Sequence, residues 1–140
     1  MRQLRYLFLL ALGLFSNASE SALLNDFSTL RWENRLIIVN QPTDPDYVLS
    51  LMKNHSEGIV DRHIVWFILK DSEALTNYSG QLSESFMSNI KQQYRLKKNT
   101  VTLIGKDGGI KSQGSTVDVK ALFLTIDAMY MRQREIQQKN

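Results

Sequence analysis

Two short apolar runs are the feature that most constrains the fold of this chain. One is residues 36–39 (LIIV), and the other is the centre of residues 63–70 (HIVWFILK). Runs of this length, rich in β-branched and aromatic residues, are typical of strands buried on both faces. Parallel strands need a crossover, which is usually a helix and nearly always right-handed. The two runs therefore predict a β-α-β unit.

The segment between the two runs carries the signals of a helix. Asp44 suits an N-cap, and Pro45 suits the first helical position, where a missing N–H costs nothing. Val48 and Met52 recur at helical spacing, and Gly58 is expected to end the helix.

The second half of the chain continues the pattern. Residues 71–83 are polar and predict a loop, after which Ser83 is expected to cap a second helix. Residues 100–106 predict a third strand. The pair Asp107–Gly108 is typical of a type I′ hairpin turn, which would return the chain as a further strand.

A last helix is predicted after Ser115 and Asp118, which fit the S-x-x-D form of a capping box. The element order is then β-α-β-α-β-β-α, which is the thioredoxin-like order. We therefore predict one α/β domain over residues 23–140, with a mixed central sheet of about four strands flanked by helices.

The first 22 residues have the three parts of a secretory signal: two arginines, a ten-residue run that is apolar apart from one glycine, and a stretch of small and polar residues. Cleavage is expected after Ala18 or Ala22. The protein is thus predicted to be periplasmic or secreted, with no membrane span after cleavage, because the apolar run is too short to cross a bilayer. An uncleaved N-terminal anchor is the alternative.

The charge balance does not favour nucleic-acid binding. The formal net charge is +3, but two of the 17 Lys and Arg residues lie in the signal segment. Cleavage after Ala18 leaves 15 Lys and Arg against 14 Asp and Glu, and cleavage after Ala22, which also removes Glu20, leaves 15 against 13. A chain this close to neutral does not predict a basic nucleic-acid surface.

Several kinds of catalytic and metal site are not supported. The chain has no cysteine, which removes thiol catalysis and cysteine metal sites. The two histidines, His55 and His63, lack a partner at metal-binding spacing, and the acidic residues near 44–46 and 71–73 do not match a calcium-binding loop. We predict no catalytic residue, no metal and no cofactor.

The glycine-rich stretch TLIGKDGGIK (residues 102–111) does not match a phosphate-binding loop. Gly105 and Lys106 are followed by Asp107 rather than Ser or Thr, and no glycine stands five residues earlier. The stretch therefore indicates a turn between strands.

The same stretch nevertheless carries a family resemblance. LIGKDGGIK, followed by IDAMYMRQRE, resembles the C-terminal signature of the domain-of-unknown-function 4174 family, and RWENRLIIV and DRHIVWFIL look like its first two strands. The resemblance implies a fold similar to thioredoxins and peroxiredoxins. It also implies a place among exported bacterial proteins or modules of sushi-repeat and matrix-associated proteins, where no biochemical activity is established.

The chain departs from the patterns of this family and of thioredoxins. Tyr130 stands where the family usually has proline, so the last helix is expected to run on unbroken. The redox centre of a thioredoxin would lie near residues 40–47, where no cysteine stands. The cis-proline position reads Lys98-Asn99-Thr100.

A thioredoxin-like fold without cysteine predicts a non-redox module, which is expected to bind a protein or an envelope or matrix partner. Lys106, Asp107, Arg132 and Glu135 are the predicted partner-binding residues, since they lie in the matching motifs. An enzyme related to peroxiredoxins that uses non-cysteine chemistry is the alternative. Trp32 is a candidate contact residue.

Trp66 is a second candidate contact residue, but it lies within an apolar run and is expected in the core. Asn54 and Asn77 begin sequons that would matter only in a glycosylating secretory pathway.

Overall fold

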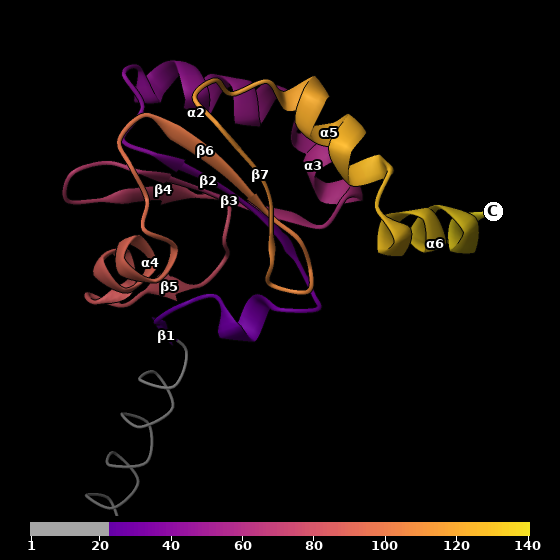
Figure 1. The fold of residues 1–140 in the computed structure, drawn as a ribbon, viewed down its shortest axis with the longest axis horizontal. Coiled ribbons are helices and arrows are strands. Elements are labelled where there is room, and N and C mark those ends of the chain that lie inside the picture. Colours follow the sequence, from indigo (N-terminus) through magenta and orange to yellow (C-terminus); the bar gives the residue numbers. More distant parts are fainter. Residues whose placement is uncertain (1–22) are drawn as a thin grey trace, which may run out of the picture.

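The structure, a computed structural model, describes residues 23–140. The predicted signal peptide and its cleavage sites lie outside the described residues. A five-stranded mixed sheet in the order β4-β3-β2-β6-β7 forms the centre of the domain (Figure 1). Its strands are β2 (Arg35–Asn40), β3 (Ile64–Leu69), β4 (Ala74–Thr76), β6 (Thr100–Ile104) and β7 (Ile110–Gly114).

The two apolar runs form the two central parallel strands, as predicted. Strands β2 and β3 are buried along their whole length, and Ile37 lies beside Trp66 in their register. The other neighbouring pairs in this sheet are antiparallel.

Helices cover both faces of the sheet (Figure 1). One face carries α2 (Pro45–Asn54), α3 (Ser56–Asp61) and α5 (Val119–Asp127), which pack on side chains such as Ile37 and Leu103. The opposite face is covered by α4 (Phe86–Tyr94), by the 3-10 turn η2 (Ser28–Leu30), and by a small sheet of β1 (Leu23–Leu24) and β5 (Gln81–Leu82).

The prediction that the first helix ends at Gly58 was wrong. The helix breaks at His55, whose Nδ1 lies 2.8 Å from the Leu51 carbonyl oxygen, and Gly58 lies inside α3. A β-carbon at Gly58 would come within 2.5 Å of the Phe123 ring of α5. This glycine therefore permits close packing of two helices rather than ending one.

The loop prediction for residues 71–83 was also wrong, because this segment contains β4 and β5. Strand β4 adds a fifth strand to the central sheet, and β5 pairs with β1 in the small sheet. Beyond β4, the side chain of Asn77 takes the place of a strand partner. Its Oδ1 accepts from the Trp66 N–H at 2.8 Å, and its Nδ2 donates to the Ile64 carbonyl at 3.1 Å.

The hairpin between β6 and β7 closes with a different turn from the one predicted. A type I′ turn needs positive φ at both central residues, but here only Gly108 has one, at +84°. The Gly108 N–H donates to the Gly105 carbonyl at 3.0 Å, and the register shifts between Leu103 and Ile104. The loop is thus the longer kind, with a left-handed glycine and a bulge.

Of the predicted helix caps, the one at Asp44 is present and the one at Ser83 is not. Asp44 accepts from the Tyr47 N–H, as expected. Asp118, rather than Ser115, is the N-cap of α5 and accepts from the Ala121 N–H. Ser83 does not cap α4, which begins after Ser85 without a side-chain cap.

The last helix is broken, contrary to the prediction. Helix α5 ends at Asp127, Met129 is extended with ψ of 142°, and α6 (Tyr130–Lys139) begins afterwards. Met129 still packs against the core although it lies between the two helices. Among the described residues of α6 only Arg132 is buried.

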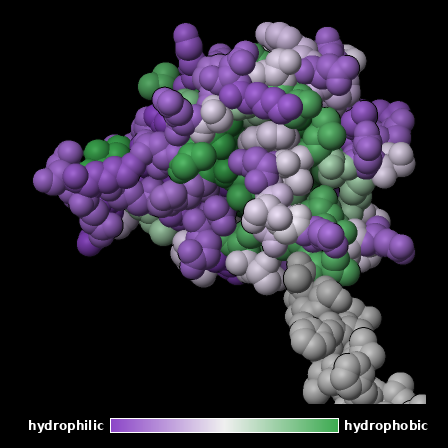
Figure 2. All heavy atoms as spheres, turned by 180° about the vertical axis from the view of Figure 1, so that it is seen from behind, coloured by the Kyte–Doolittle hydropathy of each residue, from purple (hydrophilic) through white to green (hydrophobic). Residues whose placement is uncertain are grey.

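Helix α6 projects beside the layered body in Figure 1, and the same end is almost wholly hydrophilic in the reverse view of Figure 2. Within residues 23–140, no helix combines the length and the apolar character that a membrane crossing requires.

Candidate partner-binding site

Lys106 links the hairpin turn to helix α6. It follows β6, and its side chain is only 8% exposed. Its Nζ donates to Glu135 Oε1 at 2.6 Å and to His63 Nδ1 at 2.8 Å. Because an ammonium group can only donate, His63 Nδ1 accepts, and the ring proton of neutral His63 lies on Nε2.

Arg35, the first residue of β2, binds the carboxylate of Glu135 as well. Its two terminal nitrogens each donate to one Glu135 oxygen at 3.1 Å, while its side chain is 1% exposed. Burial alone would raise the pKa of Glu135, but the bonds from Arg35 and Lys106 outweigh burial and hold that pKa at about 2. Arg35 Nε is buried and has no partner among the described residues.

Arg132 anchors the first turn of α6 to two other elements. Its Nη2 donates to Asp61 at the end of α3 at 2.6 Å, and its Nε donates to Asp127 of α5 at 3.0 Å. Arg62 holds Asp127 through two further bonds, and Lys139 reaches Asp61. Helix α6 is therefore attached to the body mainly by ion pairs.

Asp107 does not belong to this network. Its side chain is 45% exposed and pairs with Lys111 at 2.8 Å. The bonds from Lys111 and from the Gly109 N–H lower the pKa of Asp107. The structure brings three of the four predicted partner-binding residues, Lys106, Arg132 and Glu135, into one cluster. Lys106 and Arg132 are buried in it. The fourth, Asp107, lies on the turn beside the cluster.

Exposed aromatic side chains flank this cluster. Trp32 is 58% exposed, and its backbone N–H donates to the Lys106 carbonyl at 2.6 Å. Tyr130, at the start of α6, is 73% exposed. Trp66, in contrast, is 6% exposed, as expected of a core residue.

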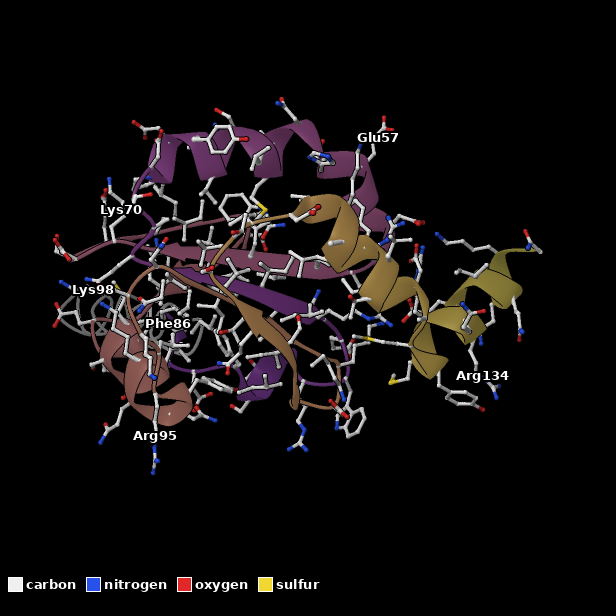
Figure 3. All side chains as sticks on the ribbon, turned by 45° about the horizontal axis from the view of Figure 1, so that its top comes forward. Glu57, Lys70, Phe86, Arg95, Lys98 and Arg134 are labelled. Atoms are coloured by element: carbon white, nitrogen blue, oxygen red, sulfur yellow. The ribbon has the colours of Figure 1, made fainter. Side chains whose placement is uncertain are left out.

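An arginine lies over each of the two exposed rings. Arg31 Cζ is 5.5 Å from the ring centre of Trp32, and Arg134 Cζ is 5.9 Å from that of Tyr130, within the range of cation–π attraction. We call Arg31, Trp32, Tyr130 and Arg134 the aromatic–arginine surface. Figure 3 shows Arg134 at the end of the molecule away from Lys98 and Arg95.

A small pocket lies at this surface, with a volume of about 240 Å³. Met129, Tyr130 and Met131 form its apolar wall, and the rest of its lining comes from Arg35, Gly105, Lys106, Asp107 and Lys111. The sequence reasoning missed Arg35, His63 and the pairing of the aromatic rings with arginines. The adjacency of Arg31 and Trp32 could have signalled the first ring–arginine pair, and the i,i+4 spacing of Tyr130 and Arg134 on a predicted helix could have signalled the second.

The thioredoxin redox position is occupied by amide side chains. Gln41 and Asn99 both have left-handed backbones, with φ of 45° and 55°, and the Asn99 N–H donates to the Gln41 carbonyl at 3.2 Å. Asn40 is 2% exposed and donates to the Lys97 carbonyl at 3.0 Å, while its Oδ1 has no partner among the described residues. Residues 23–140 contain no cis peptide bond and no group of three or more potential metal ligands.

Comparison with solved structures shows the fold. The chain is similar to a reduced 2-Cys peroxiredoxin of Plasmodium vivax, with a TM-score of 0.53 and 11% sequence identity, over 76% of this chain and 83% of that one. The domain thus has the thioredoxin-like fold that the element order predicted. Among proteins with curated descriptions, none matches the chain. The domain of unknown function DUF4174 matches residues 26–135, and the chain belongs to that family.

Proposed function

We propose that this protein is an exported thioredoxin-like module that does no cysteine redox chemistry and binds a protein partner in the cell envelope or an extracellular matrix. Export is supported by the signal-like composition of the first 22 residues, and the absence of redox chemistry by a sequence without cysteine.

One observation carries the binding proposal: Trp32 and Tyr130 are both exposed and both neighbour Lys106, which a buried ion network holds in place. Trp, Tyr and Arg are the residue types that contribute most at protein interfaces. A rigid support lowers the entropy cost of binding, because the contact residues are already positioned.

The test is affinity capture from the compartment in which the protein resides. Trp32→Ala and Tyr130→Ala are expected to weaken capture of the partner, whereas Tyr47→Ala is not. Tyr47 is a matched control because it is 61% exposed on α2, away from the Lys106 turn. Capture that is equal for all three variants, or absent for the unmodified protein, would contradict the proposal.

Mass spectrometry of the mature N-terminus tests cleavage after Ala18 or Ala22.

A second candidate is an enzyme using non-cysteine chemistry. The hydrogen-bonded chain from Glu135 through Lys106 to the half-exposed His63 favours it, since such chains can orient an imidazole for proton transfer. Peroxidase and disulfide-reduction assays on the purified protein separate the two candidates, because turnover in either assay would overturn the binding-module proposal.

A further inference from the structure

The aromatic–arginine surface carries positive charge that the described part of the chain does not neutralise. Neither Arg31 nor Arg134 forms an ion pair within residues 23–140, although Asp107 and Glu135 are close in the fold and are paired with Lys111, Lys106 and Arg35. Both arginines are exposed. A binding partner could therefore supply carboxylates to both.

The bonds that these arginines do make leave their charge available. Arg31 Nε donates to the Asp107 carbonyl at 2.9 Å. Arg134 Nη1 donates to the Tyr130 hydroxyl at 3.1 Å. Each guanidinium is thereby held over its ring, with further N–H groups left to donate. A positioned guanidinium binds a carboxylate with less loss of side-chain entropy than a free one.

The pocket next to Tyr130 adds an apolar component. Its wall of Met129, Tyr130 and Met131 is apolar and its methionines are flexible, which suits an inserted hydrophobic side chain. Its volume of about 240 Å³ limits the insertion to a single side chain. Phosphate-rich ligands such as nucleic acids would gain little from such a wall. The nearly balanced charge of the chain also argues against them.

We propose that the aromatic–arginine surface binds an acidic segment of a protein, with carboxylates meeting Arg31 and Arg134 and one apolar side chain seated in the pocket. The inference rests on the proposed function and names the chemistry of the partner that the same surface would take.

Selection of random displayed peptides on the purified protein tests the inference. Enriched peptides are expected to carry Asp or Glu around a Phe, Leu, Trp or Tyr, and to bind more weakly as salt rises. Binding is expected to fall at least about tenfold in Arg31→Glu and in Arg134→Glu, and also in Met131→Ala. Lys98→Glu is the matched control, because Lys98 is an exposed cation at the other end of the molecule (Figure 3). This variant is expected to bind the peptides normally.

Several results would overturn the inference. Peptides without acidic residues, binding that survives both arginine substitutions, or a selection that enriches nothing would each do so. Arginine-dependent binding to vesicles of phosphatidylcholine with phosphatidylglycerol would point to a lipid surface instead. If native capture still depends on Trp32 and Tyr130 in these cases, the proposed function stands while the acidic partner does not. Circular dichroism and thermal unfolding of each variant exclude loss of folding as the cause.

Discussion

Arg35 and Glu135 lie 100 residues apart in the sequence and meet in two parallel nitrogen–oxygen contacts of 3.1 Å. Arg35 opens the central strand β2, whereas Glu135 belongs to α6, the last helix of the chain. Because Lys106 donates to the same carboxylate, one acidic side chain joins the core strand, the hairpin turn and the C-terminal helix. The aromatic–arginine surface therefore depends on a buried ionic support.

Replacing Glu135 by glutamine is expected to destabilise the protein by about 3–5 kcal/mol, since it leaves Arg35 and Lys106 buried without a carboxylate. Glu73→Gln is the control, because within residues 23–140 the Glu73 carboxylate forms only an exposed pair with Lys70. Its loss is expected to cost at most about 1 kcal/mol. Urea unfolding measures both. Equal losses in the two variants would show that the buried network contributes no more than a surface pair.

The same carboxylate predicts a loss of stability in acid. The pKa of Glu135 is lowered from 4.5 to about 2 in the folded state, so its contribution is complete above pH 4.5 and is lost as the pH falls toward 2. Melting temperatures are expected to fall over this interval in the unmodified protein and to change less in Glu135→Gln. Identical pH profiles would assign the acid sensitivity to other groups.

Local signals in the sequence were enough to predict the centre of the fold. The short apolar runs of β2 and β3, the cap at Asp44 and the buried Trp66 all depend on neighbouring residues, and the structure confirms them. Strand β4 was missed because it is short, half-buried and polar at its edges. The break at Met129 was missed because ionic contacts with distant residues, rather than local propensity, place α6.

The candidate site was predictable only in part, for the same reason. The family resemblance drew attention to Lys106, Arg132 and Glu135, and these three residues do cluster. No periodicity connects them with Arg35 or His63, because those contacts are made between separate elements of the sheet and helices. That Lys106 and Arg132 are buried could not be read from residue type, since such side chains are usually exposed.

Gly108→Ala is expected to destabilise the hairpin by about 1–2 kcal/mol, because φ at this position is +84° and a β-carbon resists that conformation. The added carbon would also lie 3.3 Å from Arg31 Nε. Gly114→Ala is the matched control on the same hairpin, since an added carbon there meets nothing within 4 Å. Thermal unfolding should separate the two, and a loss of stability in Gly114→Ala alone would contradict the assigned turn.

The two sequon asparagines are expected to differ in their structural roles. Asn77→Ala should cost about 1–3 kcal/mol, because it leaves the Trp66 N–H and the Ile64 carbonyl without their partners. Asn54→Ala, at the exposed end of α2, should change the free energy of unfolding by no more than about 0.5 kcal/mol. Chemical denaturation of both variants checks this, and a larger cost at Asn54 would argue against the role given to Asn77.

His63 is expected to titrate below its usual range. Burial lowers its pKa, and the nearby Lys106 ammonium lowers it further. Lys106→Met should raise this pKa, since it removes the positive charge 2.8 Å from Nδ1 while keeping most of the apolar stem. The change is measured by following the ring signals of His63 by nuclear magnetic resonance as the pH is varied.

The same spectra test the tautomer. The ammonium of Lys106 donates to Nδ1, so nitrogen shifts should place the proton of neutral His63 on Nε2, and Lys106→Met should allow both tautomers. Glu135→Gln provides the opposing control, because removing its negative charge should lower the His63 pKa rather than raise it. Shifts of the same sign in both variants would mean that altered burial, and not the charges of the Glu135–Lys106–His63 chain, governs this histidine.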